Sequence, residues 1–183
     1  MMCIEEDELR VSGRGKSMRY HINWGTYGSW LPGDPRGFRT RRHRMHVEGN
    51  YRNPPPVGVY EGLHEHVKAN LRKPPIALPD ELRPAVGCAC LEQFEKEGVC
   101  AYALSVGGEH VHAAVDCSPE GLKQMVGRVK KVSSHRIRDQ IPGKVWSGGC
   151  KPVVVRDEQH WRNVLKYIRD HAPQAWVWVR DGT

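Results

Sequence analysis

The chain has 183 residues, 39% of them hydrophobic, a length that suits one domain with additions better than two full domains. It has no run of 18 apolar residues and no apolar secretion signal, which excludes a membrane-spanning helix and leads us to expect a cytoplasmic protein with reduced cysteines. Lysine and arginine number 28 against 21 acidic residues, and the net charge of +7 favours a polyanionic partner.

The first predicted element follows a polar N-terminal segment. Residues 1–17 contain no apolar stretch, so we expect a mobile tail followed by a single domain over residues 18–183. Residues 19–27 alternate between apolar and polar side chains, and this period of two predicts a strand. Its apolar face carries Tyr20, Ile22 and Trp24.

A basic insertion rich in proline and glycine follows, at about residues 28–79. A segment of this length within a compact domain usually has structure or function of its own. Apolar residues at i+4 spacing predict a short helix over residues 60–72. A second apolar stripe predicts a helix from Pro79 to residue 97, where Gly98 ends it.

Two strands are predicted next, over residues 99–106 and 109–117. Both are rich in small and β-branched side chains, as strands are. Gly107 and Gly108 lie between them and are typical of a two-residue hairpin turn. The two strands are therefore expected to be antiparallel neighbours.

The last part of the chain supplies two helices and a strand. Ser118 and Pro119 suit the start of a helix that we expect to continue to residue 140. A strand is predicted over residues 150–156 and a helix over residues 157–171. The order of elements is strand, helix, strand, strand, helix, strand, and then one additional helix.

That order is typical of an α+β, ferredoxin-like βαββαβ fold. Such a fold has an antiparallel sheet with helices on one face, and its first and third strands lie at the centre. The third strand is the one over residues 109–117, which reads EHVHAAVDC.

Two histidines on this strand are candidate metal ligands. Residues two apart in a strand project to the same face, so the imidazoles of His110 and His112 can converge on one cation while Val111 points to the core. Two surface histidines on an exposed sheet face are the alternative. His64 and His66 have the same spacing but lie on a predicted helix, where they differ by about 200° and cannot easily share an ion.

The final helix carries a candidate nucleophile. Tyr167 and His171 are one helical turn apart, on a face beside the apolar stripe. A cation held by two histidines needs a further ligand, and His171 can supply it. The Tyr167 phenol would then lie near a metal-bound phosphate, and its attack on phosphorus needs charge neutralisation and an in-line oxygen. A half-buried packing tyrosine is the alternative.

These motifs resemble those of a known family. EHVHAAVD resembles the histidine–hydrophobic–histidine motif of the HUH endonucleases. KYIRDH resembles the tyrosine helix of the single-tyrosine HUH transposases, namely the insertion-sequence 200-like and REP-associated tyrosine transposases. The resemblance covers roughly residues 20–178.

The resemblance implies an enzyme that cleaves single-stranded DNA and transfers the strand through a 5′-phosphotyrosine. By position, His110 and His112 are metal ligands and Tyr167 is the nucleophile. The family often has a glutamine as its third ligand, four residues after the tyrosine, where this chain has His171. The resemblance implies Mg²⁺ or Mn²⁺ as the metal, but imidazole favours softer ions than Mg²⁺.

The clustered basic residues of this chain favour single-stranded or hairpin DNA as its partner, because arginine and lysine contact phosphates. Trp30 lies in the same insertion and is the tryptophan best suited to base stacking. An ordinary solvated basic face is the alternative, and the sequence leaves a monomer or a homodimer open. The candidate DNA contacts are Arg36, Arg39, Arg41, Arg42 and Arg44 in the insertion, and Lys130 and Lys131 on the second main helix.

Three other functions fit part of the pattern. RNA-recognition domains share the element order but need aromatic side chains on their central strands, where this chain has histidines. A histidine-triad nucleotide hydrolase would need a further histidine in place of Ala114. A domesticated transposase that binds DNA hairpins without cutting them has the same features, and only a nicking assay separates it from an active enzyme.

Overall fold

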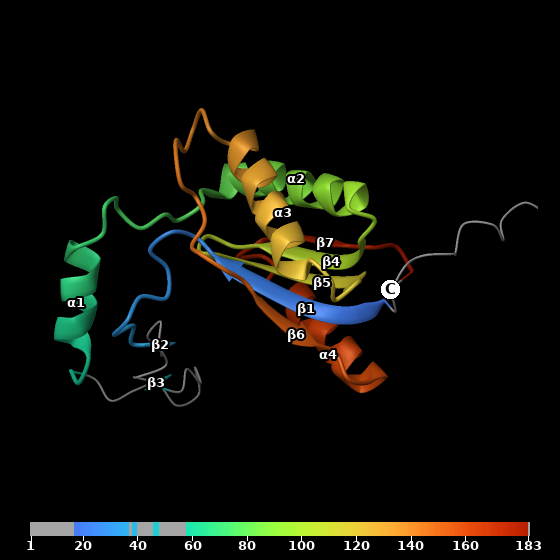
Figure 1. The fold of residues 1–183 in the computed structure, drawn as a ribbon, viewed down its shortest axis with the longest axis horizontal. Coiled ribbons are helices and arrows are strands. Elements are labelled where there is room, and N and C mark those ends of the chain that lie inside the picture. Colours follow the sequence, from blue (N-terminus) through green and yellow to red (C-terminus); the bar gives the residue numbers. More distant parts are fainter. Residues whose placement is uncertain (1–16, 37, 40–45, 48–57, 183) are drawn as a thin grey trace, which may run out of the picture.

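A five-stranded antiparallel sheet is the centre of the protein (Figure 1). The structure, a computed structural model, describes residues 17–36, 38–39, 46–47 and 58–182. The strands lie in the order β6–β1–β5–β4–β7. Their bounds are Met18–Gly25 for β1, Cys100–Val106 for β4, His110–Cys117 for β5, Lys151–Val154 for β6 and Trp176–Val179 for β7.

The order β6–β1–β5–β4 confirms the predicted α+β, ferredoxin-like arrangement, with the first and third predicted strands, β1 and β5, adjacent inside the sheet. The strand β7 was not predicted. It pairs antiparallel with β4 and extends the sheet by one strand beyond the βαββαβ core. The predicted N-terminal tail, residues 1–17, lies outside the described residues except for Ser17.

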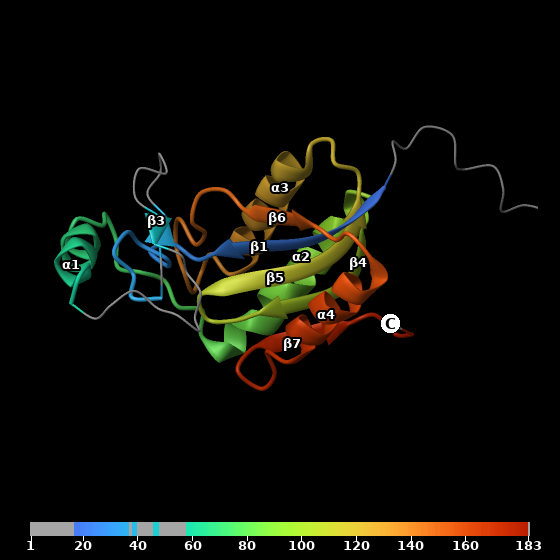
Figure 2. The same ribbon diagram turned by 90° about the horizontal axis from the view of Figure 1, so that it is seen from below.

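Helices cover both faces of the sheet. Figures 1 and 2 show α2 and α3 on one face and α4 on the other. The two faces differ because strand residues alternate: Ile22 and Val111 lie in the core under α2 and α3, whereas Ala103 and Ala114 pack against α4. The bounds are Arg83–Lys96 for α2, Leu122–Arg136 for α3 and Glu158–Arg169 for α4.

Both bounds of the helix predicted over residues 118–140 were wrong, and the helix predicted over residues 157–171 ends at Arg169, before His171. The helix α3 begins at Leu122 rather than at Ser118, because Gly121 has a left-handed backbone (φ 67°) that completes a turn before the helix. The Ser118 hydroxyl accepts a hydrogen bond from the Glu120 amide within that turn, at 3.2 Å, and does not cap the helix. The helix also ends at Arg136, four residues before its predicted end.

The insertion has regular structure of its own at its described residues. The predicted helix over 60–72 is α1, Glu61–Ala69, and the strands Phe38–Arg39 (β2) and His46–Val47 (β3) form a separate two-stranded sheet. These elements lie beyond one end of the main sheet (Figure 1). Among the described residues, no helix has the length and apolar character needed to cross a membrane, and the five described cysteines are free thiols.

Candidate active site

Helix α4 is fixed to the sheet at one end by a cap and along its length by an apolar stripe. The Asp157 carboxylate accepts a hydrogen bond from the His160 amide at 2.7 Å, which satisfies a free donor at the helix N-terminus. Four side chains then point to the sheet at i, i+3, i+4 and i+7: Trp161, Val164, Leu165 and Ile168. They pack on Ala103 and Ala114, whose small side chains allow the helix to approach closely.

Tyr167 lies next to this stripe in the last turn of α4, and His171 lies in the turn that follows the end of the helix at Arg169. The Tyr167 side chain is 46% exposed. His171 Nδ1 lies 2.8 Å from the Tyr167 carbonyl oxygen, which can only accept, so Nδ1 carries the proton and donates it. The lone pair of His171 is therefore on Nε2, which is free to bind a cation.

Three histidines converge at this point. One ring nitrogen from each of His110, His112 and His171 lies within 4.8 Å of the others, and no other cluster of three potential ligands occurs among the described residues. The ring centroids of His110 and His112 are 4.8 Å apart, as are those of His112 and His171. The spacing predicted from sequence thus brings the three candidate ligands together.

His21 is a fourth histidine at the site, and sequence reasoning missed its role. Its Nε2 lies 3.0 Å from His112 Nδ1. If His112 is to offer its Nε2 lone pair to a metal, its Nδ1 must donate to His21. The only sequence signal was that His21 lies on the face of β1 opposite Ile22, and its approach to His112 depends on the pairing of β1 with β5.

Burial favours the neutral form of His112, His21 and His110. Burial, followed by the nearby His110 and His21, lowers the pKa of His112 to about 2, and burial lowers the pKa of His21 to about 4. Burial and the neighbouring His171 also lower the pKa of His110. Neutral imidazoles keep the lone pairs that metal binding requires, so the chemistry of the donor set fits a divalent cation.

The Tyr167 ring lies directly over this cluster. Its centroid is 5.2 Å from that of His112 and 4.7 Å from that of His171, and it meets both rings edge-on. The Ser105 hydroxyl lies opposite His112 in the β4–β5 register. It is 1% exposed and has no hydrogen-bond partner among the described residues, so it adds an unsatisfied polar group beside the histidines.

The predicted DNA contacts are not gathered in one place. Lys130 and Lys131 lie on α3, on the face of the sheet opposite the histidines. Lys131 is exposed, whereas Lys130 donates to the carbonyls of Ser147 and Gly149 at 2.7 and 2.6 Å. The backbone of Arg39 lies in β2. Arg41, Arg42 and Arg44 lie outside the described residues.

Arg36 is paired with two carboxylates. Its guanidinium contacts Asp34 at 2.8 Å and Glu109 at 2.7 Å. The hydrogen bonds that Arg36 donates to Asp34, and then to Glu109, outweigh burial and raise the pKa of Arg36 above its usual value. Burial alone would raise the pKa of Asp34, but the hydrogen bonds from Arg36 hold it below its usual value. Arg36 is therefore a cation whose charge is compensated locally.

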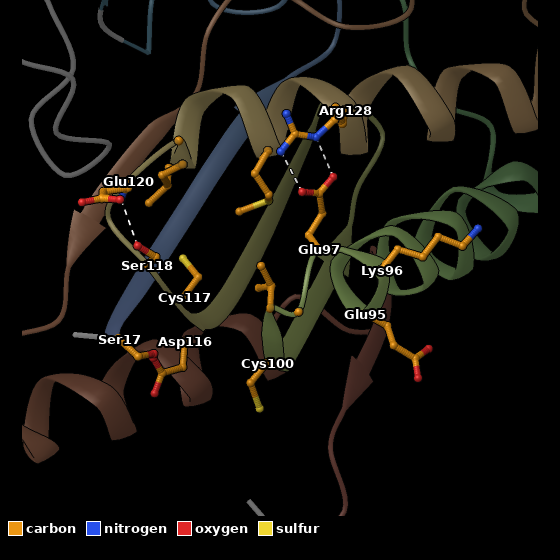
Figure 3. A pocket seen from close by; sticks show the side chains of 15 residues that line it. Ser17, Glu95, Lys96, Glu97, Cys100, Asp116, Cys117, Ser118, Glu120 and Arg128 are labelled. Carbon is orange, nitrogen blue, oxygen red and sulfur yellow. Dashed lines mark hydrogen bonds and ion pairs between the residues drawn. The ribbon is translucent and has the colours of Figure 1, made fainter. Parts of the chain in front are cut away.

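An open hollow of about 750 Å³ lies elsewhere, at the Cys117 end of β5 (Figure 3). An ion pair between Glu97 and Arg128, 2.6 Å long, lines it. The candidate active site is at the opposite end of this strand, beginning at His110, so the hollow and the histidines are separate features.

Two solved structures are similar in fold to this chain. No curated protein sequence matches the chain. A solved structure of a candidate transposase from Deinococcus radiodurans R1 is similar, with 16% identity, a TM-score of 0.48, and coverage of 87% of this chain and 95% of that one. A REP-associated tyrosine transposase bound to a REP hairpin is also similar, with 13% identity, a TM-score of 0.46, and coverage of 93% and 82%.

The sequence model of one family matches residues 69–171, which is more than half of the chain. The matched segment begins in the insertion and includes both strands of the hairpin, α3 and the whole of α4. It contains all three clustered histidines and Tyr167. The chain therefore belongs to the family of IS200-like transposases.

Proposed function

We propose that this protein cleaves single-stranded DNA and rejoins it in a metal-dependent reaction, with Tyr167 as the nucleophile. One observation carries the proposal: the Tyr167 ring, in the last turn of α4, lies against two of the three histidines that form the only candidate metal cluster among the described residues. A transposase must break and make phosphodiester bonds, and these residues supply an oxygen nucleophile beside a cation site.

The reaction is a transesterification. The Tyr167 phenol oxygen attacks phosphorus, the bond from phosphorus to the 3′ oxygen breaks, and the phenol proton ends on the released 3′-hydroxyl. The products are a 5′-phosphotyrosine and a free 3′ end. Strand transfer is the reverse step with a different 3′-hydroxyl, so bond energy is conserved and no external energy source is needed.

His110, His112 and His171 would hold the cation through ring nitrogens, with His171 using Nε2. A divalent cation, when bound, neutralises charge on the non-bridging phosphate oxygens. Three imidazoles and no carboxylate form a donor set that is softer than the oxygen ligands Mg²⁺ prefers, so we expect Mn²⁺ to bind more tightly than Mg²⁺. His21 would orient His112 through the 3.0 Å contact between their ring nitrogens.

The substrate would be single-stranded or hairpin DNA. The surplus of seven basic charges and membership of a transposase family support this choice. Lys131 is exposed on α3 and remains a candidate phosphate contact. Arg36 is less suited to that role, because Asp34 and Glu109 already compensate its charge.

The test is adduct formation on labelled single strands that carry hairpins from the gene's own flanking DNA. Wild-type protein with Mn²⁺ should give a covalent protein–DNA band on a denaturing gel, and Tyr167→Phe should give none while it still binds the strand. Tyr102→Phe is the matched control, because Tyr102 also packs against α4, through Trp161, yet lies away from the histidines.

Two outcomes would contradict the proposal. An adduct that persists in Tyr167→Phe means that the nucleophile is another residue. A wild type that binds these hairpins with high affinity but forms no adduct in Mn²⁺ or Mg²⁺ supports instead a domesticated transposase that binds hairpins without cutting them.

A further inference from the structure

Trp30 has two properties that are unusual for a tryptophan. Its side chain is 47% exposed, although large aromatic side chains are usually buried to a greater degree. It is also the only non-glycine residue among the described residues with a positive φ, at 55°. A strained backbone of this kind persists only where the surrounding structure enforces it, and such residues are concentrated in ligand-binding and catalytic sites.

Trp30 lies beside the histidine cluster. The residues of β1 that face away from the main core include His21 and Gly25, and Gly25 pairs directly with His110 in the register of β1 and β5. A side-chain carbon at Gly25 would lie 3.6 Å from Trp30 Cδ1. The indole therefore lies beside Gly25, the residue that pairs with His110, on the face of the sheet that carries the candidate metal ligands.

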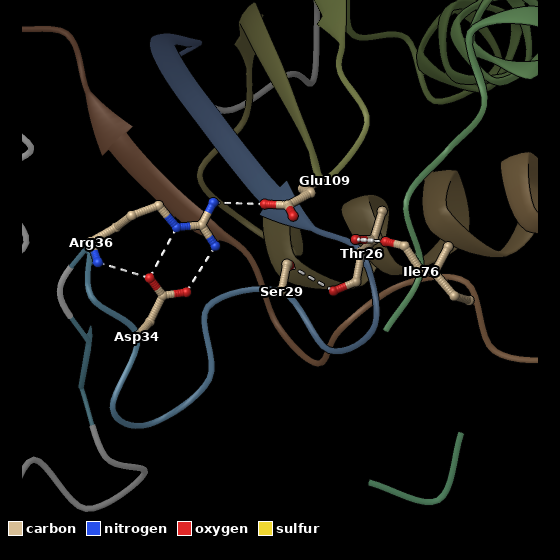
Figure 4. A network of polar contacts seen from close by, with 6 residues as sticks. All are labelled: Thr26, Ser29, Asp34, Arg36, Ile76 and Glu109. Carbon is tan, nitrogen blue, oxygen red and sulfur yellow. Dashed lines mark hydrogen bonds and ion pairs between the residues drawn. The ribbon is translucent and has the colours of Figure 1, made fainter. Parts of the chain in front are cut away.

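Arg36 forms a second planar group in the same place. Its guanidinium lies over the Trp30 ring, 4.4 Å from the centroid. Asp34 fixes this plane with hydrogen bonds from two guanidinium nitrogens, at 2.9 and 2.8 Å, and Glu109, the residue before His110, fixes it with a third at 2.7 Å (Figure 4). The guanidinium is thus rigid and electrically compensated.

A compensated guanidinium is poorly suited to holding a phosphate, but it still has the flat face that Trp30 does not cover. Arginine planes and indole rings are the groups on which unpaired bases stack in single-strand binding proteins. Stacking does not depend on base identity or on a free positive charge. Base pairs of a duplex are already stacked on each other, so such a site selects an unpaired base.

We propose that Trp30 and Arg36 form a stacking site for one unpaired nucleobase of the DNA strand, at a nucleotide that flanks the phosphate attacked by Tyr167. This inference rests on the proposed function, because it assumes that a single strand crosses the histidine cluster. The site would hold the strand by a base on one side of the reacting phosphate, next to His110, and so would set the position of that phosphate.

The experiment measures strand binding in a Tyr167→Phe background, where no adduct can form. The probes are a labelled dT 15-mer and a labelled strand of the same length made of abasic nucleotides. Fluorescence anisotropy measures the binding of each probe over a range of salt concentrations. Trp30→Ala should weaken dT binding by about 5- to 100-fold. The same change should leave the affinity for the abasic strand, and the salt slope, unaltered, because no phosphate contact is removed.

Two controls separate stacking from loss of structure. Val59→Ala removes another exposed apolar side chain of the insertion, 58% exposed, and should not alter either affinity. Tryptophan emission gives a second measurement: the dT strand should quench it in protein with Trp30, the abasic strand should not, and Trp30→Phe should lose the quenching while it retains part of the affinity.

The inference fails if Trp30→Ala leaves dT affinity unchanged, if it weakens both strands equally, or if it lowers the salt slope, which would indicate a phosphate contact. The adduct assay on wild-type protein decides the proposed function separately. A missing adduct with base-dependent binding through Trp30 overturns the cleavage chemistry and leaves the stacking site in place. An adduct together with base-independent binding supports the cleavage chemistry and overturns the stacking site.

Discussion

The packing of β7 against α2 gives a quantitative prediction for Gly87. This glycine is buried within α2, and a side-chain carbon there would overlap the ring of Trp176, the first residue of β7; even Cη2 would be only 2.6 Å away. Carbon atoms pack at about 3.5–4.0 Å. The ring would therefore have to retreat by about 1 Å or more, and β7 with it.

We expect Gly87→Ala to destabilise the protein by about 0.5–2 kcal/mol. Overpacking of this kind costs about 1–3 kcal/mol, and the higher helix propensity of alanine offsets about 0.5–1 kcal/mol of that cost. Gly127 is the matched control, since it lies within α3 with no atom within 4 Å of an added carbon. Gly127→Ala should stabilise the protein by about 0.5–1 kcal/mol.

Guanidinium chloride unfolding of the two variants measures both free energies. Trp176→Ala should remove the penalty of Gly87→Ala when the two changes are combined, because the overlapping ring is then absent. If Gly87→Ala stabilises the protein as Gly127→Ala does, or if its penalty persists without the Trp176 ring, the described packing of β7 on α2 is incorrect.

Three further predictions concern the histidines. His112→Ala should abolish Mn²⁺ binding in calorimetry, whereas His64→Ala, in α1, should leave it intact; equal binding in both variants would end the metal hypothesis. His171→Gln, which replaces an imidazole by a harder oxygen donor, should shift the ratio of Mg²⁺ to Mn²⁺ affinity towards Mg²⁺, and an unchanged ratio would show that His171 is not a ligand. His21→Phe keeps a ring but removes the acceptor for His112 Nδ1, so Mn²⁺ affinity should fall roughly 10- to 100-fold. His21→Gln should recover part of that affinity. If the loss in His21→Phe is no larger than in His21→Gln, His21 does not orient His112.

The elements that could be predicted from the sequence are those whose pattern is local. The alternation over 19–27 and the stripe of Trp161 to Ile168 each arise from neighbours within one element. The strand β7 could not be predicted in this way: its four residues, WVWV, do not alternate in polarity, and its partner β4 lies about 70 residues earlier in the chain. Its pairing depends on the completed sheet.

The candidate site likewise contains local features that could be predicted and long-range contacts that could not. The spacing of His110 and His112 on a strand is enough to place that pair on one face. Tyr167 and His171 also come together, but α4 ends at Arg169 and His171 lies in the turn that follows it. The contact of His21 with His112 needs the β1–β5 register, and the pairing of Arg36 with Glu109 joins residues 73 positions apart. Contacts of that range follow from the assembled fold and not from any sequence period.

Two methyl groups set the height of α4 above the sheet. Ala103 and Ala114 are fully buried beneath the apolar stripe of the helix, on the face that also carries His112. A larger side chain at either position would raise the helix, and Tyr167 would move away from the histidines while all the reacting groups stayed intact. The proposed cleavage is therefore expected to be sensitive to a change of one or two carbon atoms at a residue outside the candidate site. If the proposed function holds, a relative that keeps Tyr167 and the three histidines but has valine or leucine at one of these positions is expected to bind its strand and fail to cut it.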